Sequence, residues 1–590
     1  GRSLPITQIV AWGRELAAML ETVHGRGFLY RDLKSTNVIV APDGRLRLID
    51  FDIADSPAEP APRSGKGTRG YASPQQRAAE APAVTDDVYG LGALLYFLAT
   101  GAEPSYTPDQ FALLDRPVTL LNPATSPALA GVIARCLDPD AAMRYPSMEA
   151  VDAALAEAGA APPASAPSFG SECRTEMSED LGLRHRALGR RLADTVCRAA
   201  RPAPNGHGLA WATRHPTSAG GTHTRDLNTG NAGTVLALAE LVAAFGDPRH
   251  RKVLAEGARW LAVAPPFEGE PLPGLYVGEA GIGAALLRAG QVLGDAPLID
   301  AAVEKGRLIA SLPFGSPDLF NGTAGRLRFH LLLWDETREE EHLAAAIRAG
   351  DSLLAAAEET TNGGLRWPIP PGYEGLSGAA YLGYAHGAAG IADALLDLYE
   401  VTGDTRLRDA VRGAADWLMW LAVPVLDDGS GLGWPALEGH EPSPPLWCHG
   451  AAGIGRFFLH ADQLGIVAGA VDVAAAAAHA TARAARWTGP TQCHGLAGSI
   501  ELLLDMFQAT GDRAYLTEAR SLAGLLEAFA SERDGALVFP AESPDLFTPD
   551  YMVGYAGVAL SLLRLGDPER QPHQLSRRGF RHRPAAESGA

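Results

Sequence analysis

Basic residues, cysteines and long apolar runs are all scarce in this sequence. Its 590 residues include 50 Lys and Arg against 69 Asp and Glu, which gives a formal net charge of −19. This balance argues against a nucleic-acid binder, because no basic surface is available to neutralise phosphates. No apolar run approaches the roughly 18 residues that a membrane-spanning helix requires. We therefore expect no membrane span and no nucleic-acid partner, but small molecules or peptides.

The few cysteines are scattered and odd in number, which argues against a disulfide-stabilised fold and favours a reducing cytoplasm. A cytoplasmic protein is therefore expected, and any metal role would involve free thiolates. The five cysteines are Cys136, Cys173, Cys197, Cys448 and Cys493.

The length and the 46% apolar content predict at least two folded units. Residues 1–158 mix helical patterns with a short hairpin over Val38 to Ile49. Residues 159–182 are rich in Ala, Pro, Ser and Gly without periodicity, which predicts a flexible linker. A second domain is expected over residues 183–567. The basic segment 568–590 is predicted to be a disordered tail that could touch an acidic leader peptide.

The second domain is repetitive. A Gly-x-x-Gly unit recurs seven times, and each unit opens an apolar helical run that is followed by a half-charged amphipathic one. Seven pairs of inner and outer helices predict a closed α/α toroid whose glycine loops meet at one pole, where we expect a ligand site. The first glycines of the units are Gly230, Gly278, Gly322, Gly387, Gly450, Gly495 and Gly554.

Cysteines stand at equivalent positions in two of these units, Cys448-His449-Gly450 and Cys493-His494-Gly495. Pseudo-symmetry would bring the two thiols together, and with His494 they form a soft ligand set suited to zinc. Three protein ligands leave a fourth position for water or substrate. Two alternatives remain open at this point: a closed structural site with His449 as the fourth ligand, and buried cysteines that bind no metal.

These Cys-His-Gly elements in a seven-repeat toroid resemble the lanthionine cyclases, the LanC-like proteins. The resemblance spans residues 183–567 and implies zinc held by Cys448, Cys493 and His494. The metal would activate a cysteine thiol of a precursor peptide for addition to dehydroalanine or dehydrobutyrine. By position in the family's motifs, His386 matches a residue that handles the proton.

Two further positions bear on that resemblance. Asp318, four residues before Gly322, matches a carboxylate that lines the same cavity. Family members carry an arginine four residues before the first zinc cysteine, whereas this sequence has Pro444. Any stabilisation of the enolate by that arginine is therefore expected to be absent or moved.

The N-terminal unit carries a second motif, Tyr-Arg-Asp-Leu-Lys-Ser-Thr-Asn over residues 30–37, followed by Asp50-Phe51-Asp52. Together with Lys66-Gly67-Thr68, Ser73-Pro74-Gln75 and Arg144, these elements resemble the C-lobe of protein kinases. The resemblance covers about residues 5–155.

In that resemblance Asp32 is the base for a Ser/Thr hydroxyl, Lys34 steadies the transferred phosphoryl group, and Asn37 and Asp50 hold Mg²⁺ with ATP. A pseudokinase is the alternative, because Asp52 replaces the usual glycine. No glycine-rich loop and no lysine precede Lys34, so the nucleotide-binding N-lobe is expected to be absent from this sequence.

A kinase C-lobe joined to a cyclase toroid resembles the class III and class IV lanthipeptide synthetases, and the intact zinc ligands favour class IV. This resemblance implies phosphorylation of Ser/Thr in a ribosomal precursor peptide with a leader, elimination of phosphate, and thioether ring formation. Two rival functions are a non-catalytic peptide-binding scaffold and a Ser/Thr protein kinase with the toroid as its sensor.

Overall fold

The structure is a computed structural model that divides into two compact units, Gly1–Ser168 and Phe169–Ala590. Lys66 of the kinase-like motifs lies outside the described residues. The structure describes residues 4–55, 67–106, 113–160, 169–170, 178–204, 206–212, 223–265, 271–426, 428–543, 545–577 and 579–580.

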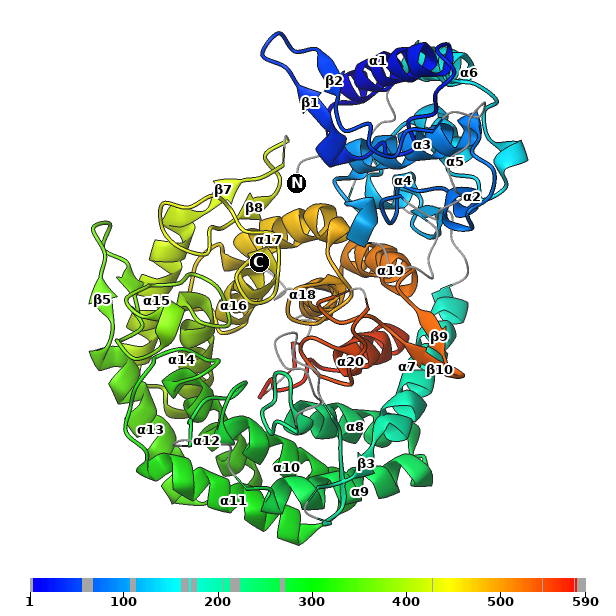
Figure 1. Ribbon diagram of the computed structural model, residues 1–590. Helices are drawn as coiled ribbons and strands as arrows, with labels where there is room; N and C mark the ends of the chain where they lie inside the picture. Colours follow the sequence, from blue (N-terminus) through cyan, green and yellow to red (C-terminus); the bar gives the residue numbers. More distant parts are fainter. Residues whose placement is uncertain are drawn as a thin grey trace. The chain divides into compact units, whose positions relative to one another are not determined.

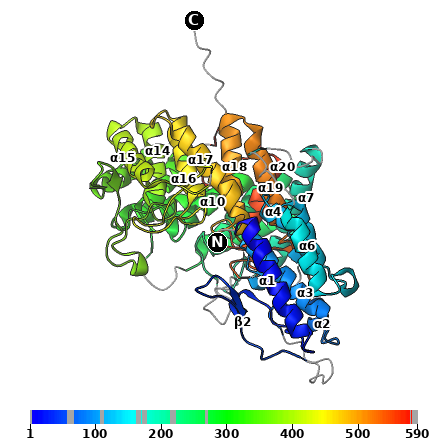
Figure 2. The same cartoon turned by 90° about the horizontal axis from the view of Figure 1, so that it is seen from above.

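The first unit is built around α3, whose sequence is apolar on nearly every side and which is buried along most of its length. The helices α1 and α6 lie side by side (Figures 1 and 2). The predicted hairpin forms with Val38 opposite Leu48. The elements of this unit are α1 (Ile6–His24), η1 (Ser35–Asn37), β1 (Val38–Val40), β2 (Leu46–Leu48), α2 (Pro74–Arg77), α3 (Val84–Thr100), η2 (Pro104–Tyr106), η3 (Leu113–Asp115), α4 (Val118–Leu121), α5 (Pro127–Cys136), η4 (Ala141–Met143) and α6 (Met148–Ala160).

In the second unit each Gly-x-x-Gly element begins an inner helix, with its first glycine at the N-cap. These helices are apolar on most sides and therefore buried. Five of those described end at a residue in the left-handed conformation, for example Gly403 at φ 68° and Gly511 at φ 73°. The inner helices are α8 (Asn231–Phe245), α10 (Glu279–Leu293), α12 (Thr323–Thr337), α14 (Ala388–Thr402), α16 (Ala451–Gln463), α18 (Leu496–Thr510) and α20 (Tyr555–Gly566).

An outer helix follows most inner helices, and the Gly-Asp pairs mark the change. The glycine ends the inner helix, and the aspartate caps the outer one: Asp404 accepts from the backbone N of Arg406 at 2.9 Å and Asp512 from that of Ala514 at 2.9 Å. The outer helices are α7 (Ser178–Ala199), α9 (Pro248–Val263), α11 (Ala296–Ser311), α13 (Glu340–Ala355), α15 (Thr405–Leu421), α17 (Ala470–Ala484) and α19 (Arg513–Glu527).

The inner helices form a closed ring within the described part of the second unit. Each contacts the next in sequence order, and α20 returns to contact α8 (Figure 1). The outer partner of α20 is α7, which comes first in this unit. The prediction of a mainly helical chain with a seven-repeat α/α toroid is therefore confirmed, and the first helix of the toroid completes the last repeat.

Short hairpins and turns lead from several outer helices to the next inner one. Three tryptophans near these hairpins each donate from Nε1 to a backbone carbonyl of the preceding outer helix: Trp211 to Val196, Trp367 to Leu353 and Trp434 to Leu418. The strand pairs are β3 (Arg201–Pro202) with β4 (Leu209–Ala210), β5 (Glu358–Glu359) with β6 (Leu365–Arg366), β7 (Val423–Pro424) with β8 (Leu432–Gly433), and β9 (Ser531–Arg533) with β10 (Ala536–Val538). Two short 3₁₀ helices complete the unit, η5 (Glu374–Leu376) and η6 (Ala485–Trp487).

The structure moves the predicted linker boundaries. The helix α6 extends to Ala160 and α7 begins at Ser178, so the predicted linker 159–182 is helical at both ends. Between them, Phe169 packs against His479 and Tyr515 of the second unit. Residues 161–168 and 171–177 lie outside the described residues.

The predicted disordered tail also differs from the structure. Residues 568–577 and 579–580 are described, and His573, Gln574 and the side chain of Arg577 are buried. Carboxylates of the toroid bind Arg577, which explains why this basic, proline-containing segment packs against the toroid. Residues 581–590 lie outside the described residues.

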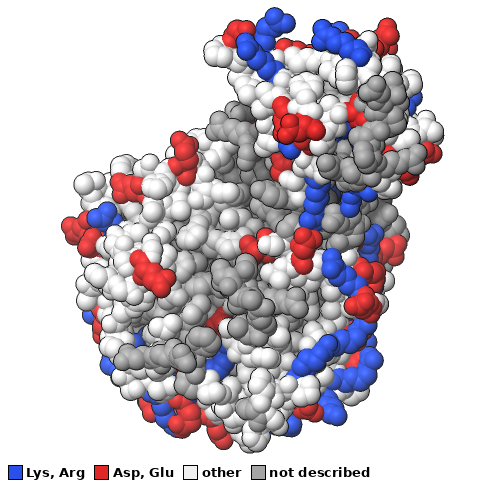
Figure 3. Space-filling view, in the orientation of Figure 1, with Lys and Arg blue, Asp and Glu red and all other residues white. Residues whose placement is uncertain are grey.

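Charged side chains of both signs alternate along the outer edge of the ring on the face shown in Figure 3. Among the described residues, no helix combines the length and the apolar character needed to cross a membrane.

Candidate functional sites

The seven glycine loops meet at one pole of the toroid because small residues let them approach closely. A Cβ atom on Gly390 would overlap the carbonyl oxygen of Tyr384, and one on Gly498 would overlap that of Gln492. Backbone hydrogen bonds then join neighbouring loops, as from Ala385 N to the carbonyl of Cys448 at 3.0 Å. Side chains that precede the first glycines therefore converge.

The three predicted metal ligands are brought together at this pole. The ligand atoms of Cys448, Cys493 and His494 all lie within 4.8 Å of one another. Both cysteines are buried, whereas His494 is exposed, and Cys493 Sγ lies 3.5 Å from His494 Nε2. Two sulfur atoms and one imidazole nitrogen suit zinc, and three protein ligands leave one tetrahedral position for a substrate. The residues present therefore fit the metal.

Electrostatics within the cluster favour a ligating form of cysteine. A hydrogen bond from Cys493 lowers the pKa of Cys448 well below its usual value, against the effect of burial. The pKa of Cys493 is raised by that same hydrogen bond and by burial. Hydrogen bonds with Cys448 and Glu542 raise the pKa of His494 to about 10. The cluster therefore favours the thiolate of Cys448, the form in which cysteine binds metals.

Glu542 orients the histidine of this cluster. Its carboxylate accepts from His494 Nδ1 at 3.1 Å and from the hydroxyl of Thr491 at 2.9 Å. With Nδ1 held by Glu542, Nε2 faces the sulfur atoms, and it would give up its proton when a metal binds. Sequence reasoning missed Glu542, because it lies 48 residues from His494 in a loop without a motif.

His449 lies beside this cluster, not in it, so the described residues do not favour the closed four-ligand site. Its ring packs on His386 at 5.7 Å and on Tyr381 at 5.4 Å between centroids. Its Nδ1 is buried without a hydrogen-bond partner, and burial lowers its pKa. Burial therefore favours the neutral form of His449.

His386, which is expected to handle the proton, pairs with Asp318, the carboxylate expected to line the same cavity. His386 Nδ1 lies 2.8 Å from Asp318 Oδ2, and the Asp318 side chain is fully buried. The other carboxylate oxygen accepts from the backbone N of Asn321 at 2.7 Å. The carboxylate therefore holds the ring with Nδ1 protonated and leaves Nε2 available. Pro444 is exposed and supplies no cationic group at the position of the missing arginine.

In the first unit the predicted catalytic-loop residues also converge. Lys34 Nζ donates to Asp32 Oδ2 at 2.8 Å, and Asn37 Nδ2 donates to the same oxygen at 3.0 Å. Thr68 donates to the other carboxylate oxygen at 2.9 Å and accepts from Lys34 at 3.1 Å. A carboxylate, an ammonium group, an amide and a hydroxyl thus face one point.

Tyr30 occupies the position of the usual histidine and makes contacts that support the loop. Its hydroxyl donates to the carbonyl of Ile49, and its ring meets Phe51 edge-on at 5.0 Å. Asp50 is exposed in the left-handed region at φ 62°. Its Oδ1 accepts a long hydrogen bond of 3.4 Å from the backbone N of Asp52. Asp50 is not hydrogen-bonded to the Asp32 cluster.

Two buried side chains join the kinase-like motifs to one another and to the helical core. Asp87 at the start of α3 accepts from the backbone N of Tyr30 at 2.9 Å and of Arg31 at 2.6 Å. Arg144 donates to Gln75 Oε1 at 2.7 Å. The kinase-like motifs noted in the sequence thus contact one another in space.

Comparison with known proteins decides the family. The family model described as "Lanthionine synthetase C-like protein" matches residues 222–575, more than half of the chain. The chain belongs to this LanC-like family. A protein kinase domain model matches residues 2–154, so a kinase domain precedes the LanC-like domain.

The curated relatives match the kinase domain and its surroundings. A probable cAMP-dependent protein kinase catalytic subunit of Encephalitozoon cuniculi is 32% identical over 126 residues, which cover 21% of this chain and 38% of that protein. The Ser/Thr kinase AfsK of Streptomyces griseus is 40% identical over 17% of this chain and 13% of its own length. PknA of Mycobacterium tuberculosis is 29% identical over 32% of this chain. The chain spans less than half of each.

One solved structure is similar to part of this chain. Nisin cyclase is 18% identical with a TM-score of 0.43, and the comparison covers 58% of this chain and 88% of that protein.

Proposed function

We propose that the LanC-like domain holds one zinc ion through Cys448, Cys493 and His494 and forms (methyl)lanthionine rings in a ribosomal precursor peptide. The observation that carries this proposal is the convergence of two thiols and one imidazole within 4.8 Å at the pole of the toroid. When bound, zinc lowers the pKa of a coordinated substrate thiol below the free value of about 8.5.

His386 and Asp318 at the pole handle the proton in the remaining steps. The substrate thiol gives its proton to His386 Nε2, the resulting thiolate adds to Cβ of dehydroalanine or dehydrobutyrine to form the C–S bond, and the alkene electrons move into an enolate. His386 then delivers a proton to Cα from Nε2, while Asp318 fixes the ring through Nδ1. Because Pro444 offers no charge, enolate stabilisation falls to neighbouring backbone and His386.

The kinase domain supplies the earlier step in this proposal. Asp32 accepts the proton of a precursor Ser/Thr hydroxyl, Lys34 steadies the phosphoryl group of ATP, and Asn37 with Asp50 holds Mg²⁺. Elimination of phosphate then gives the dehydrated residues that the cyclase consumes. The intact ligand set supports class IV over class III synthetases. The four cysteines described as free, Cys136, Cys197, Cys448 and Cys493, suit a cytoplasmic location.

Metal analysis and ring closure test the cyclase. The purified chain is expected to contain about one zinc per molecule and to consume thiols of a dehydrated precursor peptide. Cys448→Ala should lose both the metal and ring closure, whereas Cys197→Ser, remote from the pole, should retain both. A zinc-free protein that still closes rings at the wild-type rate would overturn the proposal.

A Ser/Thr protein kinase with the toroid as a sensor is the second candidate, favoured by the kinase names of the curated relatives. It predicts phosphorylation of proteins unrelated to a precursor peptide and no change in peptide thiols. A non-catalytic scaffold, favoured by Asp52 in place of glycine, predicts leader binding with no change in peptide mass.

A further inference from the structure

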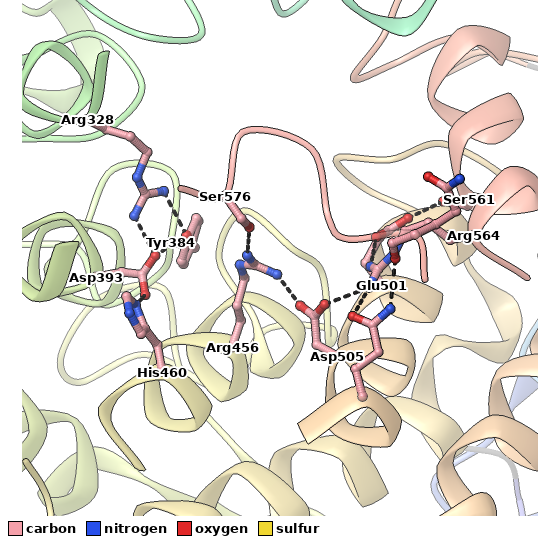
Figure 4. A network of polar contacts seen from close by, with 12 residues as sticks. Arg328, Tyr384, Asp393, Arg456, His460, Glu501, Asp505, Ser561, Arg564 and Ser576 are labelled. Atoms are coloured by element: carbon pink, nitrogen blue, oxygen red, sulfur yellow. Dashed lines mark hydrogen bonds and ion pairs between the residues drawn. The ribbon is translucent and has the colours of Figure 1, made fainter. Parts of the chain in front are cut away.

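The bore of the toroid beneath the pole contains a chain of buried charges. The inner helices place ionisable residues six and ten positions after their first glycine, so these side chains face inward on one helix stripe (Figure 4). The ionisable sixth positions are Arg328, Asp393, Arg456 and Glu501, and the ionisable tenth positions are Glu240, Arg288, Asp397, His460, Asp505 and Arg564.

These charges tie neighbouring helices together. Arg328 of α12 donates to Asp393 of α14 at 2.6 Å and to Asp397 at 2.8 Å. His460 of α16 contacts Asp393 at 2.8 Å. The next link is the ion pair of Arg456 on α16 with Asp505 on α18.

The chain continues to α20, where Arg564 donates to Asp505 at 2.9 Å and pairs with Glu501. The helices α12, α14, α16 and α18 are those whose N-terminal loops carry Asp318, His386 and the metal ligands.

The C-terminal segment crosses the bore and joins this chain. Arg577 binds Asp335 of α12 and Glu400 of α14, each at 2.6 Å. The hydroxyl of Ser576 accepts from Arg456. Further back, the carbonyl of Gln571 accepts from side chains of α18 and α20. A cavity of about 680 Å³ remains beside the segment. The C-terminal segment therefore crosses the bore without filling it.

At the pole, successive loops are joined by backbone hydrogen bonds with one exception. Cys493 N donates to Met552 O at 2.8 Å, and Met552 N donates to Asn228 O at 3.1 Å. The ring continues through the other loops to Ala385 and Cys448. Among the described residues, no such hydrogen bond joins the loop of Cys448 to that of Cys493. The loops of Cys448 and Cys493 therefore lack the backbone hydrogen bond that joins every other pair of neighbouring loops at the pole.

We propose that Arg456 and Asp505, braced by Ser576 of the C-terminal segment, are positioning residues that set the distance between α16 and α18 so that Cys448 and Cys493 share one metal. The inference rests on the proposed zinc site. The side chains of Arg456 and Asp505 are 7% and 1% exposed, and a buried ion pair resists separation because either charge alone would be stranded. This ion pair joins α16 and α18, the two helices whose N-terminal loops have no backbone hydrogen bond between them.

The test measures metal binding, not turnover. Cobalt(II) is titrated into metal-free protein, and the thiolate-to-cobalt absorption band reports how many cysteines coordinate; chelator competition gives the affinity. The variant Arg456→Met/Asp505→Leu removes both charges, which avoids stranding either partner. We expect affinity to fall about tenfold and the thiolate band to weaken, in the range seen when supporting contacts of a metal ligand are lost.

The matched control is Arg288→Met/Glu240→Gln. This pair joins α8 and α10 by two hydrogen bonds of 2.7 and 3.0 Å, but neither helix carries a predicted ligand. It should bind cobalt as the wild type does. Equal weakening in both variants, or none in Arg456→Met/Asp505→Leu, would overturn the inference. A wild type that binds no metal would instead overturn the proposed function.

Two further variants control for misfolding and isolate the contribution of the C-terminal segment to metal affinity. Arg456→Lys keeps a buried charge but cannot reach Asp505 and Ser576 together, so an intermediate loss of affinity is expected. A chain that ends at Glu569 removes Ser576 and should weaken cobalt binding several-fold from the far side of the bore. Wild-type affinity in the truncated chain would remove the segment from the proposal, and wild-type affinity in Arg456→Lys would contradict the role of Arg456.

Discussion

Glu542 is not itself one of the proposed metal ligands, but its carboxylate orients the ligand His494. The hydrogen bond at Nδ1 fixes the tautomer that presents Nε2 to the metal. The same arrangement occurs at Asp318 and His386, where the imidazole is expected to carry a proton instead. Two histidines of the same pole are thus each oriented by a carboxylate. One is proposed to bind the metal, and the other is proposed to carry a proton.

Glu542→Ala should weaken metal affinity about tenfold, because His494 would lose the acceptor that selects its tautomer. Glu542→Gln should cost less, since the amide oxygen can still accept from Nδ1. Chelator competition measures both. Glu532→Gln, on the exposed strand β9, is the control, and equal affinities in all the variants would contradict the role of Glu542.

Asp550 is a buried carboxyl group in the loop before α20, at the repeat position that Asp318 occupies before α12. Burial, helped by the nearby charge of Asp226, raises its pKa from 3.8 to about 8. Between these values the unfolded chain releases the proton while the folded chain keeps it. Stability from this group is thus complete below pH 4 and is lost as the pH rises toward 8.

Asp550→Asn should therefore become more stable relative to the wild type as the pH rises, by about 4 kcal/mol between pH 4 and pH 7. Denaturant unfolding at pH 4, 5, 6, 7 and 8 measures the difference. The exposed Asp534→Asn should leave the pH dependence unchanged. Parallel stability curves for Asp550→Asn and the wild type would show that the carboxyl is ionised in the folded protein.

At the scale of helices, the second glycine of each repeat determines how closely a loop lies against its own inner helix. In α18 a Cβ on Gly498 would overlap the carbonyl of Gln492, whereas Gly524 in α19 has open space around it. Gly498→Ala should lower the free energy of unfolding by about 2 kcal/mol or more. Gly524→Ala should raise it by about 0.5–1 kcal/mol, because alanine favours helix.

Thermal and denaturant unfolding of the two variants provides the measurement. Each replaces glycine by alanine within a helix of the same repeat, so composition and propensity cancel between them. Similar stabilities for the two would mean that the loop relaxes without cost and that the repeat does not require its second glycine.

The repeat period made much of the architecture predictable, and it predicted the convergence of Cys448 and Cys493, because the two cysteines share one register. The charges of the bore share a register too, but polar residues inside a helix also fit a solvent-facing side, and only the closed ring shows that Arg328 and Arg564 face inward. Glu542 has no motif. The segment around Arg577 has the composition of a disordered tail, and its acidic partners lie on distant helices.

At the scale of the whole chain, the toroid needs its first helix. Because α7 packs on α20, a fragment of residues 169–590 should fold, whereas one of residues 200–590 should expose the apolar side of α20 and aggregate. Size-exclusion chromatography and circular dichroism distinguish these results. A monomeric, cooperatively unfolding 200–590 fragment would show that the ring tolerates an open seam.

The pairing of α7 with the end of the chain also bears on how the protein folds. Thr195 donates to the carbonyl of Leu537 at 2.8 Å across 342 residues of sequence. Linear repeat proteins can grow from any repeat by adding neighbours, but a ring must in addition close so long a loop before its last contacts form, which slows folding. Until that moment the unpaired faces of α7 and α20 are exposed together, and the nascent chain is at its greatest risk of exchanging partners with another copy.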